Sequence, residues 1–328
     1  MRNILVISND IAKIAVKPSP HTFHPRHADE IQQAAAGKAE VIIASPTEAA
    51  SHFADAEVIA AFPTRVPEIA IIPNAKWIHS FSAGVDKILT PRVVASAVLV
   101  SNSSGIHATP ISEHIIGFML MWTRRSAAAL RNQQAHEWGK DESLDELREK
   151  NILIVGLGEI GMETARIAHA FGTRIKAVSR SPKNKQDFIE RIGLQKDLGA
   201  MLPEADFVVI TLPHTEETHH LFDAKKFALM KKEAVVINIG RGGIINEQDL
   251  VDALKNKTIA GALLDVFETE PLPSDSPLWD MEQVIITPHN SGLSQKYMDR
   301  AVTLFCKNLR AYLAGEKLPN EVDKKLGY

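Results

Sequence analysis

The chain has 328 residues, a length that suits two domains better than one small core. Its hydrophobic content of 45% and charged content of 23% are ordinary for a globular protein, and its formal charge of −3 lacks the basic excess that nucleic-acid binding needs. No apolar run approaches the roughly 18 residues of a membrane span. The single cysteine, Cys306, excludes an internal disulfide and fits a reducing compartment. We therefore expect a cytoplasmic protein with neither a nucleic-acid nor a membrane partner.

The first hundred residues contain several short apolar runs that are typical of buried parallel strands. These runs are Ile4–Ser8, Glu40–Ala44, Val58–Phe62, Lys76–Ser80 and Ala97–Ser101. The small-residue turn Ala83-Gly84-Val85 follows one of them. Such a turn either aims backbone N–H groups at an anion or simply connects a strand to a helix, and the residues alone leave both interpretations open.

A proline-rich stretch, Pro18–Arg26, leads into three histidines at three-residue spacing, which are His21, His24 and His27. Three histidines can bind a metal ion, but a metal site needs a defined ligand geometry. The prolines favour an irregular surface loop, so we predict no metal there.

A long helical pattern runs from Pro110 to about Trp138. Its first half, Ile111–Trp122, is apolar on nearly all sides, which predicts burial and suggests contact with a second subunit in a homodimer. A domain boundary near Val100–Thr109 would make this helix the crossover into a second domain. The charged stretch Lys140–Lys150 then predicts a surface loop.

The stretch Asn151–Gly161 combines an apolar run with the pattern G-x-G-x-x-G, and a helical pattern over Met162–Phe171 follows it. In this strand–turn–helix context Gly156 makes a tight turn, Gly158 lets a pyrophosphate approach the backbone, and Gly161 lets the helix pack on the strand. The free N–H groups at the helix N-terminus would face the phosphates. The stretch therefore predicts a dinucleotide site.

Strands and helices alternate regularly after this motif, which predicts a doubly wound parallel sheet of the Rossmann type. The strands are expected at Arg174–Val178, Asp206–Leu212, Ala234–Ile239, Ile259–Asp265 and Val284–Thr287, and helices at about Ala224–Lys231 and Glu247–Lys255. A last amphipathic helix, Gln295–Gly315, lies beyond this sheet. We predict an α/β fold with two doubly wound parallel-sheet domains. Residues 101–292 form a dinucleotide-binding domain inserted in a substrate-binding domain made of residues 1–100 and 293–328.

The end of the second strand of the dinucleotide domain indicates which cofactor is bound. In NAD-binding folds a carboxylate about 20 residues beyond the glycines usually binds the ribose. Here Ser179 takes that place and Arg180 follows, with Lys183 and Lys185 nearby. A hydroxyl and a guanidinium suit a 2′-phosphate, whereas an acid would repel it. The sequence therefore predicts NADP, with NAD as the alternative.

Three expected strand-end loops carry charged groups, and the ends of parallel strands line the ligand crevice of such sheets. They contain Arg241 between glycines, the run Asp265–Pro271, and Thr287-Pro288-His289. These residues resemble those of the D-isomer-specific 2-hydroxyacid dehydrogenases. The resemblance extends from about Trp77 to Tyr312 and includes Ser82–Asp86, the glycine motif, Leu212–Thr218, Met230-Lys231, Ile237–Gly242, Gly261–Phe267 and Glu270–Leu272. The Ser179–Ser181 string is similar to that of the NADPH-dependent glyoxylate/hydroxypyruvate reductases of this family.

The resemblance implies a hydride transfer between NADPH and a small 2-oxo acid, giving the D-2-hydroxy acid. The family's catalytic residues match Arg241, Glu270 and His289. His289 would act as the general acid and base, paired with Glu270, for which the nearby Glu268 could be mistaken. Arg241 would bind the carboxylate and the carbonyl of the substrate.

The resemblance also implies the binding contacts. The substrate carboxylate would meet the backbone of Ala83, Gly84 and Val85, and Asp265 would orient the carboxamide of the cofactor. The other expected cofactor contacts are Glu159, Ile160, Ser181, Leu212, Pro213, Thr218, Ile239, Gly240 and His289 itself. Two alternatives stay open: an NAD-linked dehydrogenase of a larger D-2-hydroxy acid, and a non-catalytic protein that senses a nicotinamide nucleotide.

Overall fold

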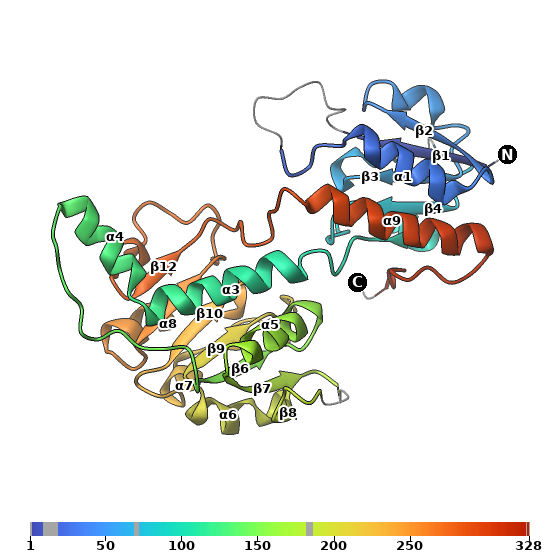
Figure 1. Ribbon diagram of the computed structural model, residues 1–328. Helices are drawn as coiled ribbons and strands as arrows, with labels where there is room; N and C mark the ends of the chain where they lie inside the picture. The colour runs from blue at the N-terminus through green and yellow to red at the C-terminus, as the bar shows by residue number, and fades with distance from the viewer. Residues whose placement is uncertain (1, 9–18, 69–71, 182–185, 326, 328) are drawn as a thin grey trace. The chain divides into compact units, whose positions relative to one another are not determined.

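The computed structural model describes residues 2–8, 19–68, 72–181, 186–325 and 327. The chain forms two compact units, Met1–His107 with Leu293–Tyr328, and Ala108–Gly292 (Figure 1). Lys183 and Lys185, expected near the 2′-phosphate, and Pro18 lie outside the described residues.

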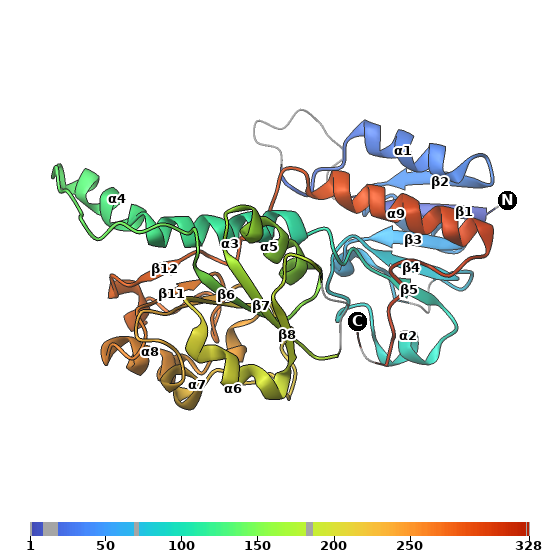
Figure 2. The same cartoon turned by 60° about the horizontal axis from the view of Figure 1, so that its bottom comes forward.

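The first unit is built on a five-stranded parallel sheet in the order β2-β1-β3-β4-β5. Its strands are β1 (Arg2–Ile7), β2 (Ala39–Ala44), β3 (Val58–Ala61), β4 (Trp77–Ser80) and β5 (Leu99–Ser101). Its helices are α1 (Pro25–Ala35), α2 (Pro91–Ala95) and α9 (Tyr297–Ala314), with the 3-10 turns η1 (Ala49–His52) and η2 (Pro63–Arg65). Helices α1 and α9 lie side by side on one face of the sheet (Figures 1 and 2).

The predicted irregular loop Pro18–Arg26 holds for residues 19–24, which lie outside any helix, and helix α1 corrects its end. The helix begins at Pro25, a favoured residue for the first helical turn, and His24 is its N-cap. His27 lies inside the helix, is 1% exposed, and its Nε2 is 2.7 Å from Asp299 Oδ1 on α9. The histidine spacing therefore reflects a helix start and a buried contact between two helices.

The second unit is built on a seven-stranded parallel sheet in the order β12-β11-β10-β9-β6-β7-β8. Its strands are β6 (Asn151–Val155), β7 (Arg174–Ser179), β8 (Arg191–Leu194), β9 (Phe207–Ile210), β10 (Val235–Asn238), β11 (Gly261–Leu264) and β12 (Val284–Ile286). Its helices are α3 (Ala108–Thr123), α4 (Ser126–Ala135), α5 (Glu159–Ala170), α6 (Leu198–Met201), α7 (Ala224–Ala228) and α8 (Glu247–Lys255). The 3-10 turns are η4 (Gln195–Asp197), η5 (Leu202–Glu204), η6 (Gly242–Ile244) and η7 (Pro277–Asp280). The predicted fold class, two parallel α/β sheets, is confirmed.

The predicted helix from Pro110 to Trp138 is wrong in its length. Helix α3 ends at Thr123, and α4 starts only after Arg125, whose φ of 52° is left-handed and breaks the helical path. Helix α4 ends at Ala135 and projects from the rest of its unit (Figures 1 and 2). Strand β8 was not predicted, because its four residues include a glycine and only two large apolar side chains.

Each sheet is packed on both faces, which its uninterrupted apolar strands require. Alternate residues of β6 show the arrangement: Leu153 and Val155 belong to one buried cluster, and Ile152 and Ile154 to another. In the first unit Ile4 and Leu5 likewise point to opposite faces. Across the described ranges, no helix has the length and apolarity needed to cross a bilayer.

Candidate active site

The order of the seven-stranded sheet reverses at β6, which pairs with β9 on one side and β7 on the other. Parallel α/β sheets bind ligands outside the carboxyl ends of their strands at such a point. The loops that follow β6, β7, β9, β10, β11 and β12 all leave this edge, and they carry the predicted cofactor and catalytic residues of this unit. The topology therefore brings these loops to one edge of the sheet.

The glycine turn after β6 has the geometry that its sequence predicts. Gly156 has φ +112°, and a Cβ on Gly161 would lie 2.1 Å from the Gly156 carbonyl oxygen, so neither position tolerates a larger residue without a shift. A Cβ on Gly158 would have no atom within 4 Å. Helix α5 starts at Glu159 with Gly158 as its N-cap and no side chain capping it. The first N–H groups of α5 therefore have no capping side chain, and the adjoining Gly158 leaves space beside them, which suits a pyrophosphate.

The turn after β7 places the three residues of the predicted 2′-phosphate site differently. Ser179 is 4% exposed, and its hydroxyl donates to the carbonyl oxygen of Ser181 at 2.6 Å. That hydrogen is therefore unavailable to a ligand, and Ser179 shapes the turn. Arg180 and Ser181 are exposed at the surface of the turn.

The loop after β9 is held by Thr218. Its hydroxyl donates to the Pro213 carbonyl oxygen at 2.7 Å and accepts from the Thr215 N–H at 2.8 Å. Thr218 is 7% exposed, so it stabilises the loop from within. The neighbouring Leu212 is half-buried, and a Cβ on Gly240 would lie 2.6 Å from the Leu212 carbonyl oxygen. The loops after β9 and β10 therefore pack backbone to backbone.

Arg241 follows β10 in a tightly built loop. Asn238 accepts from the Gly240 N–H and donates to the Arg241 carbonyl oxygen, each at 3.1 Å. A Cβ on the next residue, Gly242, would lie 1.9 Å from the backbone carbon and oxygen of Phe267, so the loops after β10 and β11 touch. Ile239 is buried beneath them. The exposed Arg241 guanidinium donates to the Gly240 carbonyl oxygen at 2.7 Å.

Glu270 and His289 come from the loops after β11 and β12 and meet at this edge. His289 Nδ1 lies 2.6 Å from Glu270 Oε2, and Glu270 Oε1 accepts from the Phe267 N–H at 3.0 Å. Both side chains are partly exposed, the imidazole at 49%, so the ring is accessible while the carboxylate fixes its orientation. Glu268 instead pairs with His220 at 2.8 Å, so the two glutamates have different partners and Glu270 is the one beside His289.

Asp265 is fully buried and anchors the segment that carries His289. Its Oδ1 accepts from the Thr287 hydroxyl at 2.6 Å and the Asn290 N–H at 3.0 Å, and its Oδ2 accepts from the Ser291 N–H at 3.0 Å. The His289 N–H donates to the Asp265 carbonyl oxygen at 2.9 Å, and His289 adopts a left-handed φ of 49°. Asp265 thus holds His289 in an uncommon backbone conformation.

Sequence reasoning missed two neighbours of this anchor. His114 Nε2 on α3 lies 3.1 Å from the Thr287 hydroxyl oxygen, and burial lowers the pKa of His114. The adjacency of Thr287 to the Pro288-His289 string was a usable signal. His114 had none, since its partner lies far along the chain.

In the first unit, the Ala83-Gly84-Val85 turn follows β4 at the carboxyl edge of its sheet. Asn102 donates to the Ala83 carbonyl oxygen at 2.8 Å, and the Ser80 hydroxyl donates to the Ser82 carbonyl oxygen at 2.9 Å. Within the described ranges, the N–H groups of Ala83, Gly84 and Val85 donate to no protein acceptor. The carbonyls are thus engaged while three consecutive donors are free, as an anion-binding turn requires.

Among the predicted site residues, the structure joins Glu270 to His289, and Asp265 to the backbone of His289. The loop of Arg241 packs on Phe267, and in the part of the chain that the structure describes the Arg241 side chain makes no hydrogen bond to Glu270 or His289. The arrangement provides a partly exposed imidazole, a carboxylate that orients it and a loop that carries an accessible cation.

The chain is similar to known proteins over most of its length. Residues 116–291 match the family model described as "D-isomer specific 2-hydroxyacid dehydrogenase, NAD binding domain". The chain is 34% identical over 284 residues to glyoxylate/hydroxypyruvate reductase B of Escherichia fergusonii, covering 84% of this chain and 87% of the relative.

Two solved structures are similar over almost the whole chain. A D-isomer specific 2-hydroxyacid dehydrogenase family protein from Aeromonas salmonicida has a TM-score of 0.82 and 32% identity, covering 98% of this chain and 99% of that one. An NADPH-dependent glyoxylate/hydroxypyruvate reductase from Sinorhizobium meliloti, solved with NADP and sulfate, has a TM-score of 0.75 and 28% identity, with both chains fully covered.

Proposed function

Because the chain belongs to the D-isomer-specific 2-hydroxyacid dehydrogenase family, an NAD(P)-dependent enzyme family, we propose that it reduces a small 2-oxo acid with NADPH. The product is the D-2-hydroxy acid, and glyoxylate and hydroxypyruvate are the expected type of substrate. The observation that carries this proposal is the Glu270–His289 pair at the carboxyl edge of the seven-stranded sheet. The glyoxylate/hydroxypyruvate reductase relatives support the substrate class.

The cofactor residues are assigned as follows. The N-terminus of α5, with Gly158 and the N–H groups of Glu159, Ile160 and Gly161, would hold the pyrophosphate, because no side chain caps this helix. Arg180 and Ser181 would hold the 2′-phosphate, and Ser179 shapes their turn from within. Leu212, Pro213, Ile239 and Gly240 lie in the adjoining loops, and Thr218 braces the first of them. When bound, NADPH supplies the hydride.

The chain's own groups supply the binding and the proton. We assign binding of the substrate's carboxylate and carbonyl oxygen to the exposed Arg241 guanidinium. Binding of a carboxylate is also assigned, within the first unit, to the free N–H groups of Ala83, Gly84 and Val85. His289 gives a proton to that oxygen as negative charge develops on it. Glu270 orients the ring and stabilises its charged form. The carboxylate of Asp265 accepts three hydrogen bonds from the segment that carries His289. Asp265 therefore contributes to the cofactor site by holding this segment in position.

The protein acts as a cytoplasmic homodimer in this proposal. The apolar α3 is largely covered within its own unit, so the support comes from α4 and the segment after it. There Leu130 is 54% exposed and Trp138 is 93% exposed, and burial of these large apolar side chains against a second copy of the chain would stabilise a dimer. The buried thiol of Cys306 is compatible with a cytoplasmic location.

One assay tests the function. The purified protein is given NADPH or NADH with a panel of 2-oxo acids that includes glyoxylate, hydroxypyruvate and pyruvate. We expect turnover with NADPH, a clear preference for NADPH over NADH, and a weaker preference in Arg180→Ala. A preference for NADH with larger acids would support the NAD-linked alternative. Nucleotide binding without turnover on the whole panel would contradict the enzyme proposal, and light scattering of a monomer would contradict the dimer.

A further inference from the structure

Four aromatic rings gather at the carboxyl edge of the five-stranded sheet, outside the catalytic pair. Tyr297 at the start of α9 is their centre: its ring lies 4.7 Å from His21, 5.4 Å from His107 and 6.3 Å from Phe62, measured between centroids. His21 and Phe62 also meet edge to face at 5.0 Å. We call these four residues the Tyr297 cluster.

The cluster is fixed in place by Tyr297. This residue is 5% exposed, and its hydroxyl donates to the Phe81 carbonyl oxygen at 2.8 Å. Burial raises the pKa of Tyr297 to about 12, so the phenol stays protonated at neutral pH and keeps this bond. The fully buried Phe81 lies behind Phe62, with ring centroids 6.0 Å apart. Phe62 therefore has rigid neighbours and little room to retreat.

The cluster borders the anion-binding turn. Strands β3 and β4 pair in register at Ala61 and Ser80, and the Phe81 N–H donates to the Ala61 carbonyl oxygen at 3.0 Å. Phe62 and the Phe81-Ser82 segment therefore leave the sheet side by side, and Ala83 follows at once. A 2-oxo acid whose carboxylate is bound at Ala83–Val85 has its C3 substituent only a few bonds away from that anchor.

Phe62, His21 and His107 are half-buried, and burial lowers the pKa of His21, which disfavours a charged imidazole beside Phe62. We propose that Phe62, backed by the Tyr297 cluster, limits the size of the substituent at C3 and so restricts the enzyme to small 2-oxo acids. This inference depends on the proposed function, because it requires the carboxylate at Ala83–Val85.

Truncation of Phe62 tests the inference in the full-length enzyme. We expect wild type to reduce glyoxylate and hydroxypyruvate but to use phenylpyruvate poorly. In Phe62→Ala the ratio of kcat/KM for phenylpyruvate to kcat/KM for glyoxylate should rise by about tenfold or more, the scale on which a few methylene groups change specificity. Phe62→Leu should give a smaller rise, and it serves if the alanine variant fails to fold.

A matched control is Phe171→Ala, which removes an equal ring from an exposed site, 41% accessible, in the other unit and should leave the ratio unchanged. Turnover of glyoxylate with an unchanged ratio in both Phe62 variants would overturn the size limit alone. Equal use of phenylpyruvate and glyoxylate by wild type would overturn it as well. Absence of turnover with every acid would overturn the proposed function and the size limit together.

Discussion

His289 is the residue on which the proposed chemistry depends most directly. Its imidazole is half-exposed and held at 2.6 Å by Glu270, an arrangement that suits proton transfer to a ligand. We expect His289→Ala to lower kcat by about 10²–10⁴-fold, the usual contribution of a general acid. Steady-state turnover with NADPH measures it. The exposed His169→Ala on α5 is the control, and an equal loss there would refute a specific role for His289.

Glu270 acts through His289, and two substitutions of Glu270 distinguish its effect on the orientation of the His289 ring from the effect of its negative charge. Glu270→Gln retains a carbonyl oxygen that can accept a hydrogen bond from Nδ1 but loses the negative charge, whereas Glu270→Ala loses both. We therefore expect kcat to fall in the order wild type, Gln, Ala. Turnover at several pH values would also show a change in profile for both variants. Unchanged rates and profiles would remove Glu270 from the mechanism.

Substitution of two glycines of the second unit by alanine should have different effects, one on cofactor binding and the other on stability. A Cβ at Gly158 meets open space, so Gly158→Ala should unfold like wild type but bind NADPH more weakly. A Cβ at Gly242 would lie 1.9 Å from the Phe267 backbone, so Gly242→Ala should lose both stability and turnover. Thermal unfolding with and without NADPH compares them. Wild-type NADPH affinity in Gly158→Ala would argue against a pyrophosphate at that turn.

At the scale of elements, local sequence predicted the parts whose causes are local. The helical pattern predicts α8 at the bounds observed, Glu247–Lys255, and the structure shows a local cause for its start, since Asn246 caps it by accepting from the Asp249 N–H. Helix α1 was not predicted, since its buried His27 is satisfied by Asp299, far away in the sequence. The break at Arg125 also carried no glycine or proline signal.

The same distinction applies to the candidate site. The glycine turn could be predicted from the sequence, because the backbone conformation at Gly156 and the close packing at Gly161 both require glycine locally. The hydroxyl bonds of Ser179 and Thr218 depend on how their turns fold, and the His114–Thr287 contact joins residues 173 positions apart. The sequence could therefore indicate which residues belong to the site, but not which hydrogen bonds their side chains make within the protein.

The contact between α1 and α9 gives a prediction on stability. Asp299 forms hydrogen bonds with the buried His27 and the exposed Arg26. These bonds hold the pKa of Asp299 below its ordinary value, and the bond with His27 has the largest effect. Asp299→Ala should lower the free energy of unfolding by about 1–2 kcal/mol at pH 7, since His27 loses its acceptor. Urea denaturation followed by circular dichroism measures this difference.

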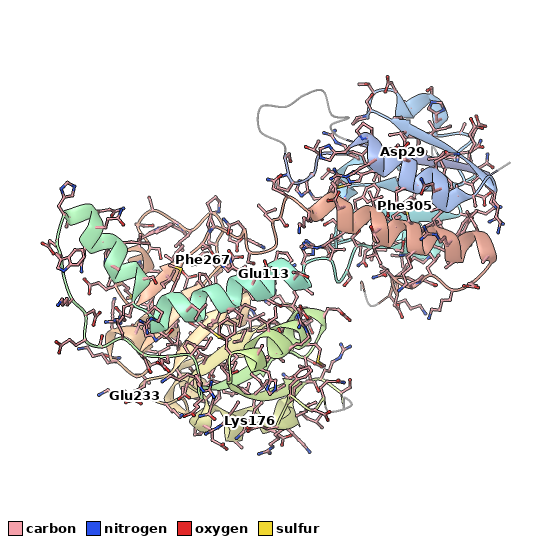
Figure 3. The ribbon with its side chains drawn as sticks, in the orientation of Figure 1. Asp29, Glu113, Lys176, Glu233, Phe267 and Phe305 are labelled. Atoms are coloured by element: carbon pink, nitrogen blue, oxygen red, sulfur yellow. The ribbon has the colours of Figure 1, made fainter. Side chains whose placement is uncertain are left out.

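The pH dependence of that difference follows from the sign of the shift. A carboxyl whose folded pKa is depressed stabilises the protein above its unfolded pKa, near 3.9, and the stabilisation is lost as the pH falls through the folded value. The gap between wild type and Asp299→Ala should therefore narrow below about pH 4. The exposed Asp29→Ala on α1 (Figure 3) is the control and should stay close to wild type at both pH values. A gap that widened in acid would contradict the assignment.

At the scale of the whole molecule, the hydrophobic cores follow the two units. The buried clusters on the two faces of the five-stranded sheet contain residues of the first unit alone, and Phe305 of α9 stacks on Trp77 there at 5.4 Å (Figure 3). The two clusters of the seven-stranded sheet likewise contain only residues between Ile111 and Ile286. The second unit is one continuous segment of chain, whereas the first is assembled from two.

This division predicts that residues 108–292 fold when expressed alone. The segment brings both faces of its core with it, and domains with their own core generally fold independently. It also contains the whole glycine turn, Arg180 and the Glu270–His289 pair, so it should bind NADPH. It lacks Ala83–Val85, so we expect no measurable reduction of a 2-oxo acid.

Circular dichroism and isothermal titration calorimetry test folding and binding, with Gly158→Ala in the same segment as the control for the cofactor site. A folded segment that did not bind NADPH would place an essential cofactor contact in the first unit, and turnover by the segment alone would refute a substrate-binding role for the Ala83–Val85 turn.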